Sequence, residues 1–173
     1  MSEERHVKPK LIVFDLDYSL WPFYVQKHLV HPLLQNKGEI FDMRLRPVKP
    51  YPEVPMILSE LNEKGYELAI ASRTSEIRGA NQLIKLLGWD KYFKYKEIYP
   101  TSKLKHFSKF CDASHYKYEE MLFFDDDHRN IQELSEVGVT CVLVPAGEGV
   151  TKNLVEAGLE LFAQNGYNWY EDY

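Results

Sequence analysis

The chain has no excess of basic residues and no long apolar run, and each absence excludes a class of function. Its 173 residues carry 21 basic and 26 acidic side chains, for a net charge of −5. Broad nucleic-acid binding needs a basic face, so this balance argues against a nucleic-acid partner. Every apolar stretch is shorter than the roughly 20 residues that cross a bilayer, so we expect no membrane span.

Cysteine is also scarce, which limits the metal and redox chemistry open to the chain. Cys111 and Cys141 form neither a zinc motif nor a dense disulfide pattern. Cys141 lies in an apolar run, which indicates a core thiol. The first ten residues are polar and lack the apolar core of a secretory signal. These features predict a cytoplasmic protein, and we expect a monomer.

What the chain does contain is an alternation of short apolar runs and amphipathic helical patterns. Strands that alternate with helices form right-handed βαβ units, so this order predicts a three-layer, Rossmann-like α/β fold with a parallel sheet. The strand signals lie at Leu11–Phe14, Glu67–Ala71, Glu97–Tyr99, Met121–Phe124 and Thr140–Val144. The helical patterns lie at 54–61, 77–87, 103–110, 130–137 and 152–164. The helix ends are marked by Gly65, Gly88, Gly138 and Gly166.

The length is that of one domain spanning residues 1–173. Residues 21–52 interrupt the alternation, since this stretch carries five prolines and no long helical period. We interpret it as a small insert of loops and a hairpin over the mouth of the sheet, too short for a separate cap domain. The tail, residues 168–173, is expected to be frayed.

Two acids, Asp15 and Asp17, follow the first strand directly. In an open α/β sheet, ligands bind outside the carboxyl ends of the strands. Two carboxylates placed there can hold a metal, attack an electrophile or transfer a proton. The alternative is an ordinary turn, because Asp-x-Asp is common in turns.

Three later segments of the sequence favour a functional site at Asp15 and Asp17 over an ordinary turn. Ser72 and Arg73 follow the second strand before a helix, where a hydroxyl, a cation and helix N–H groups would form an anion site. Thr74 or Ser75 is expected to cap that helix. Lys103 begins a helix, where the helix dipole disfavours a cation unless acids lie near.

The third segment is Asp125-Asp126-Asp127, directly after an apolar strand. Adjacent acids repel one another unless a positive charge is close, although Asp127 is also typical of a helix start. Lys105 competes with Lys103 as the nearby lysine, and spacing does not decide between them. Oxygen-only ligands suit a hard cation, and Mg²⁺ is the usual choice beside phosphate. A phosphomonoester substrate is therefore expected.

In this order, the segments resemble the four motifs of the haloacid dehalogenase (HAD) superfamily of phosphotransferases: Asp15–Ser19, Ser72, Lys103 and Asp125–Asp126. The resemblance covers nearly the whole chain and narrows to the magnesium-dependent phosphatase 1 family through longer blocks. These blocks are Phe14–Phe23, Tyr51–Pro55, Ala71–Ile77, Ile98–Pro100 and Phe123–Asp126. Ser19 departs from the usual Thr of the motif but keeps the hydroxyl. The resemblance implies an HAD-like fold with a minimal cap or none.

It also implies a role for each matching residue. Asp15 would be the nucleophile that forms an aspartyl-phosphate, and Asp17 the general acid and then base. Mg²⁺ would bind to Asp15, the Asp17 backbone carbonyl and Asp126, with Asp125 a secondary candidate. Phosphate would contact the Leu16 N–H, Ser72, the Arg73 backbone and Lys103. On the substrate side we name Tyr24 and the Arg73 side chain.

The resemblance further implies phosphosugars, including glycated sugar phosphates, and phosphotyrosine as substrates of this phosphoric monoester hydrolase. The rival function is a receiver-type phosphoacceptor module, which also uses acids, Mg²⁺, a hydroxyl and a lysine. A receiver is phosphorylated after its third strand, whereas here Asp15 and Asp17 follow the first strand and the later acids the fourth. A catalytically inert binding relative is disfavoured by the intact motifs.

Overall fold

A parallel sheet of five strands forms the centre of the computed structural model, which describes residues 7–171 and the side chains of residues 7–165. The strands are β1 (Leu11–Phe14), β4 (Leu68–Ser72), β5 (Phe93–Ile98), β6 (Met121–Asp125) and β7 (Thr140–Leu143). Their order is β5-β4-β1-β6-β7, and every neighbouring pair is parallel. All four residues of β1 are buried, as expected of a central strand covered on both faces.

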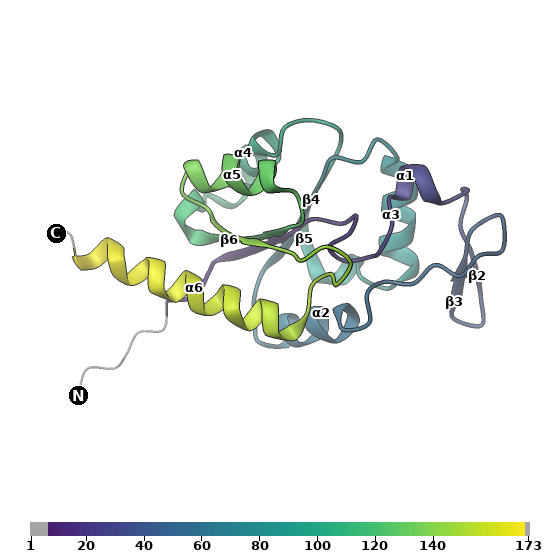
Figure 1. Cartoon of the computed structure of the whole chain (residues 1–173), viewed down its shortest axis with the longest axis horizontal. Helices are drawn as coiled ribbons and strands as arrows, with labels where there is room; N and C mark the ends of the chain where they lie inside the picture. The colour runs from purple at the N-terminus through teal and green to yellow at the C-terminus, as the bar shows by residue number, and fades with distance from the viewer. Residues whose placement is uncertain (1–6, 172–173) are drawn as a thin grey trace.

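Helices cover both faces of this sheet (Figure 1). One face packs against α2 (Val54–Glu63), α3 (Ile77–Leu86) and α6 (Lys152–Glu171), and the other against α4 (Lys103–Ser114) and α5 (His128–Glu136). Successive side chains of a strand point to opposite faces. Accordingly, Ile12 and Phe14 belong to the first core, while Val13 belongs to the second with Phe107 and Phe110 of α4. The predicted three-layer α/β fold is confirmed.

The order of the strands creates the crevice in which the site lies. β1 is flanked by β4 and β6, which are the second and fourth strands of this sheet along the chain. The helical connections that follow β1 and β6 therefore cross opposite faces of the sheet. Ligands bind where neighbouring strands diverge in this way, at the switch point of the sheet. A receiver-type sheet differs, because its first strand lies between its second and third.

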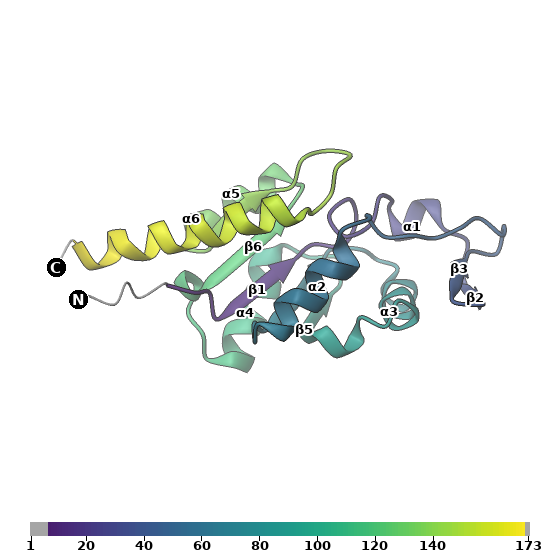
Figure 2. The same ribbon diagram turned by 90° about the horizontal axis from the view of Figure 1, so that it is seen from below.

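The insert, residues 21–52, contains α1 (Val25–His28) and a hairpin of β2 (Leu34–Asn36) and β3 (Glu39–Phe41). The hairpin lies at the opposite end of the molecule from the C-terminal part of α6 (Figure 2). It is attached to α3, since the Gln82 side chain accepts from the Leu33 N–H at 3.0 Å and donates to its carbonyl at 3.2 Å. The α1 end of the insert is therefore the part that reaches the mouth of the sheet.

One helix end differs from the prediction. α6 continues through Gly166 to Glu171, so the expected helix end at Gly166 is wrong, and residues 168–171 belong to this helix. An interior glycine costs a helix only about 1 kcal/mol, which is not enough to end it. Residues 172–173 lie outside the described part of the chain. Within residues 7–171, no helix combines the length and the apolarity that a bilayer crossing requires.

Candidate active site

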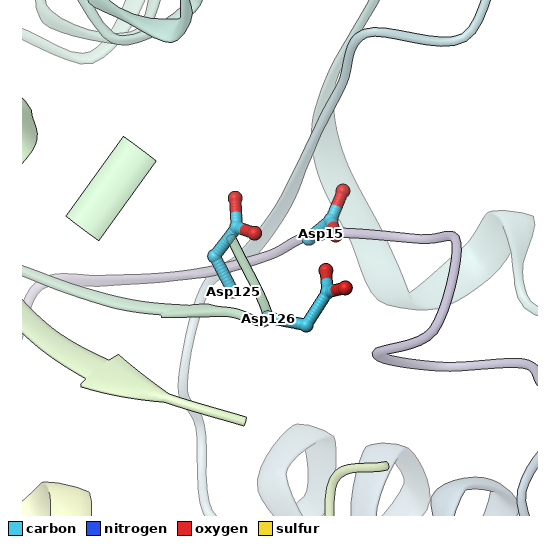
Figure 3. Close-up of side chains that lie close together, drawn as sticks. All are labelled: Asp15, Asp125 and Asp126. Atoms are coloured by element: carbon cyan, nitrogen blue, oxygen red, sulfur yellow. The ribbon is translucent and has the colours of Figure 1, made fainter. Parts of the chain in front are cut away.

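Three carboxylates meet at the carboxyl ends of β1 and β6. Asp15 follows β1, Asp125 is the last residue of β6, and Asp126 is the next residue. Figure 3 shows their side chains turned toward one another, and one oxygen of each lies within 4.8 Å of the others. Asp15 and Asp125 are buried. Such a group of like charges requires a cation or a bound proton, because the carboxylates repel one another.

Lys103, the first residue of α4, supplies one positive charge. Its Nζ donates to Asp15 Oδ1 at 2.8 Å and to Asp125 Oδ2 at 2.7 Å, and the side chain is 1% exposed. Burial lowers the pKa of Lys103, but the charges of Asp15 and Asp125 outweigh it, so the pKa is raised above its usual value. Lys105 instead lies exposed, with Nζ 5.8 Å from the Tyr99 ring centroid. The structure therefore places Lys103, and not Lys105, in the acid cluster.

Three protein donors contact the Asp125 carboxylate. Its Oδ2 accepts from Lys103 and from Asn130 Nδ2 at 3.0 Å, and its Oδ1 accepts from the Asp127 N–H at 2.8 Å. Burial and then the charge of Asp15 raise the pKa of Asp125 to about 6, against the opposing effect of Lys103. Asp127 caps α5 by accepting from the Arg129 N–H at 2.8 Å. Asp125 thus orients the lysine and the start of α5.

The carboxylates of Asp15 and Asp126 are placed to share a cation. Burial raises the pKa of Asp15 to about 7, Lys103 lowers it, and the neighbouring Asp126 raises it further. Ser19 Oγ donates to Asp15 Oδ2 at 3.3 Å. A raised pKa means that Asp15 holds a proton readily when no cation compensates its charge. Two close oxygen donors without nitrogen or sulfur fit Mg²⁺, which prefers carboxylates and water.

Asp17 is held by the start of the insert. The chain turns after it at Tyr18, whose φ is +59°. Asp17 Oδ1 accepts from Trp21 Nε1 at 2.8 Å and from the Val25 N–H at 3.2 Å. Burial raises the pKa of Asp17, against the opposing effect of these hydrogen bonds. A fixed carboxyl with a raised pKa is suited to carrying a proton to a leaving oxygen.

A loop after β4 brings Ser72 to the cluster. Ser72 is buried, and its Oγ accepts from the Thr74 N–H at 3.2 Å, while Thr74 Oγ1 accepts from the Glu76 N–H at 3.2 Å. Helix α3 begins only at Ile77, and its N-cap is Glu76, which accepts from the Gly79 N–H at 3.0 Å. The expectations that Thr74 or Ser75 caps this helix, and that helix N–H groups adjoin Ser72, are wrong. Two successive hydroxyl-backbone turns occupy the intervening residues instead.

His106 is a buried residue that sequence reasoning did not single out. Its Nε2 lies 3.0 Å from both the Ser72 and the Tyr99 carbonyl oxygens, which accept a hydrogen bond from the ring in the tautomer protonated at Nε2. The ring stacks on Tyr99 with centroids 4.3 Å apart, and Nδ1 lies 3.2 Å from the Ser102 carbonyl. Burial lowers the pKa of His106. The only sequence signal is its position three residues after Lys103, on the same helix face.

A cavity of about 330 Å³ opens over the cluster. Every site residue expected from the sequence lines it except Leu16, whose side chain is buried in the core. Four further lining residues were not anticipated: Gln26, Lys27, Thr74 and Asn130. Gln26 and Lys27 come from α1, which is too short to show a helical period in the sequence.

Known proteins share this sequence pattern over most of its length. Residues 7–165 match the model of a family described as acid phosphatase. Human magnesium-dependent phosphatase 1 is 45% identical over 157 residues, which cover 90% of this chain and 88% of that protein. An HAD-like hydrolase superfamily protein of Schizosaccharomyces pombe is 35% identical over 144 residues, covering 76% of this chain and 83% of that one.

Solved structures share the fold at low sequence identity. The phosphatase-containing N-terminal part of a Bacteroides fragilis protein, solved with Mg, has a TM-score of 0.64 at 16% identity and covers 90% of this chain and 41% of that one. The D,D-heptose 1,7-bisphosphate phosphatase of Burkholderia thailandensis has a TM-score of 0.53 at 16% identity, covering 91% and 98%. At such identities the likeness concerns the fold alone.

The strand order, the acid cluster and these relatives define a phosphatase of the HAD superfamily. Within that superfamily, the chain belongs to the acid phosphatase family, alongside magnesium-dependent phosphatase 1. The predicted superfamily, family and Mg²⁺ cofactor are confirmed by this assignment.

Proposed function

We propose that this chain hydrolyses phosphomonoesters through an aspartyl-phosphate formed on Asp15, with Mg²⁺ as cofactor. The observation that carries the proposal is the contact between Asp15 and Lys103 at 2.8 Å, beside the carboxylate of Asp126. A cation beside the attacking carboxylate can hold the phosphoryl group against it, which is the main requirement of phosphoryl transfer.

The two aspartates divide the reaction between them. An Asp15 oxygen attacks phosphorus, and the bond from phosphorus to the ester oxygen breaks as Asp17 donates a proton to that oxygen. Asp17 then takes a proton from water, which attacks the same phosphorus, releases inorganic phosphate and restores Asp15. The raised pKa of Asp17 supports this role, because the group must hold a proton before the first step.

The remaining site residues would bind the metal ion or the phosphate group. Mg²⁺ would be held by Asp15, Asp126 and the backbone carbonyl of Asp17, and when bound it neutralises charge on the transferring group. The phosphate would accept hydrogen bonds from Lys103 and Ser72 and from the backbone N–H groups of Leu16 and Arg73. Asp125 would act indirectly, because its oxygens are already bonded to Lys103, Asn130 and Asp127.

For substrates, we propose phosphosugars, including glycated sugar phosphates, and phosphotyrosine. The open cavity supports this range, since bulky leaving groups can extend past the exposed Tyr24 at its edge. The strand order argues against the rival receiver-type module. A cytoplasmic location is supported by two free cysteines, Cys111 and Cys141, which are typical of a reducing compartment.

Hydrolysis of p-nitrophenyl phosphate tests the proposed reaction. Wild-type protein should turn over with Mg²⁺ and stop when the metal is chelated, and Asp15→Asn should abolish turnover while the protein stays folded. Asp112→Asn, the same chemical change at an exposed position of α4, is the matched control and should retain activity. Turnover by Asp15→Asn would remove Asp15 as nucleophile, and a stable phosphoprotein without turnover would favour the receiver.

A further inference from the structure

Two cationic side chains line the cavity without a role in the proposed reaction. Lys27 lies on α1 and Arg73 follows β4, and both are exposed. Within residues 7–165, neither lies in an ion pair with a carboxylate. The proposed phosphate contacts use only the backbone of Arg73, so both side-chain charges line the cavity without a carboxylate partner among residues 7–165.

The negative charge of the cavity makes these two cations important for binding an anionic leaving group. Five aspartates line it, and Lys103 is already paired with Asp15 and Asp125. A leaving group that carried its own negative charge would be repelled by the remaining carboxylates as it entered. Lys27 and Arg73 are the cations placed to offset that repulsion, because like charges destabilise and opposite charges stabilise a bound group.

An aromatic pair links the acid cluster to Lys27. Lys27 Nζ lies 5.2 Å from the centroid of the Tyr24 ring, and Tyr24 meets Tyr18 edge-to-face with centroids 4.6 Å apart. Tyr24 and Asp126 line the same cavity as Lys27, and partial burial together with the charge of Asp126 raises the pKa of Tyr24. A substrate that extends from the phosphate site along Tyr24 therefore brings its far end to the Lys27 ammonium.

We infer that Lys27, together with Arg73, binds a second anionic group on the leaving group. The preferred substrates are then phosphomonoesters whose leaving group carries a carboxylate or another phosphate. This inference rests on the proposed phosphatase function and specifies the substrate class of the same site. The simpler alternative is a solvated lysine that merely stacks on Tyr24.

Two aryl phosphates of nearly the same shape separate these alternatives. 4-Carboxyphenyl phosphate and 4-carbamoylphenyl phosphate differ at the far end of the ring by one negative charge. The measured quantity is the ratio of kcat/KM for the carboxylate ester to kcat/KM for the amide ester. Comparing this ratio between proteins cancels the intrinsic reactivity of the two esters.

The expected result is a lower ratio in Lys27→Gln than in wild type, by about two- to fivefold, the scale of an exposed ion pair. Lys27→Glu should lower it further, and added salt should lower it in wild type through screening. Lys109→Gln removes the same charge from an exposed position of α4 outside the cavity and should keep the wild-type ratio. Melting temperatures establish that each variant is folded.

If the ratio is the same in wild type, Lys27→Gln and Lys27→Glu, the inference about Lys27 is overturned while the proposed phosphatase function stands. Failure of wild type to hydrolyse either ester would overturn the proposed function, and the inference with it. A parallel comparison of fructose 1,6-bisphosphate with fructose 6-phosphate identifies the anion. A preference for the bisphosphate that Lys27→Gln loses would assign phosphate, and a Lys27 effect confined to the aryl carboxylate would assign carboxylate.

Discussion

Replacing Lys103 with methionine tests the charge balance of the site most severely. The variant keeps an unbranched apolar stem but removes the ammonium that contacts Asp15 at 2.8 Å and Asp125 at 2.7 Å. Removing one partner of a buried ion pair costs about 3–5 kcal/mol, because the other charge is left uncompensated. We therefore expect Lys103→Met to lose about that much unfolding free energy near neutral pH, together with its phosphatase activity.

The loss should depend on pH in a defined direction. In wild type, burial raises the pKa of Asp15 to about 7 and that of Asp125 to about 6, while Lys103 opposes both shifts. Without Lys103 both values rise further. A carboxyl whose pKa is higher in the folded state favours folding below its unfolded pKa, and that stability is lost as pH rises through the folded value. The deficit should accordingly be smallest near about pH 5 and grow toward about pH 8.

Urea unfolding followed by tryptophan fluorescence, at several pH values without Mg²⁺, measures this deficit. Lys105→Met is the matched control, because Lys105 lies exposed over the Tyr99 ring in the same helix turn. It should unfold like wild type throughout. The reasoning is refuted if Lys103→Met is as stable as Lys105→Met, or if its deficit is the same at every pH.

Three further perturbations follow from the same geometry. Trp21→Phe removes the 2.8 Å hydrogen bond to Asp17. Because one hydrogen bond contributes about 1 kcal/mol, its loss should lower kcat about fivefold, and an unchanged kcat would contradict this role of Trp21. Mg²⁺ should bind more weakly as pH falls below about 7, because a proton on Asp15 competes with the metal; calorimetric affinities that do not vary with pH would count against this. Gly149 has a φ of +68°, and in Gly149→Ala the new Cβ would lie 2.2 Å from Tyr51 Cδ2. We therefore expect a lower melting temperature in a thermal scan. A variant as stable as wild type would show that Tyr51 can move away.

The strands and the main site residues can be predicted because burial and function leave marks that are local in the sequence. β1 and β6 are covered on both faces, so they are continuous apolar runs. Acids placed directly after such runs must lie at the same edge of a parallel sheet. Asp15 and Asp125 are identifiable on that ground from the sequence alone.

Other features depend on contacts distant in sequence. Lys103 and Lys105 both lie in the first turn of α4, and residues two apart lie on different faces of a helix, so only the packed structure separates them. His106 gives no local signal beyond its position three residues after Lys103, because its partners are backbone carbonyls of three other residues. The Glu76 cap and the continuation of α6 differ from the prediction because a hydroxyl or a glycine favours a helix end without fixing it. Glu76 caps α3 through its own side chain, and an interior glycine such as Gly166 costs a helix only about 1 kcal/mol.

The central claim is that Asp15 carries the phosphoryl group during turnover. The most direct measurement is acid quench of Asp17→Asn during reaction with p-nitrophenyl phosphate, followed by mass spectrometry of its peptides. This aryl leaving group needs little protonation, so the variant should form the intermediate but hydrolyse it slowly. The account predicts phosphate on the peptide at Asp15 and none in an Asp15→Asn, Asp17→Asn double variant. Phosphate on another residue, or continued turnover without any phosphopeptide, would contradict it.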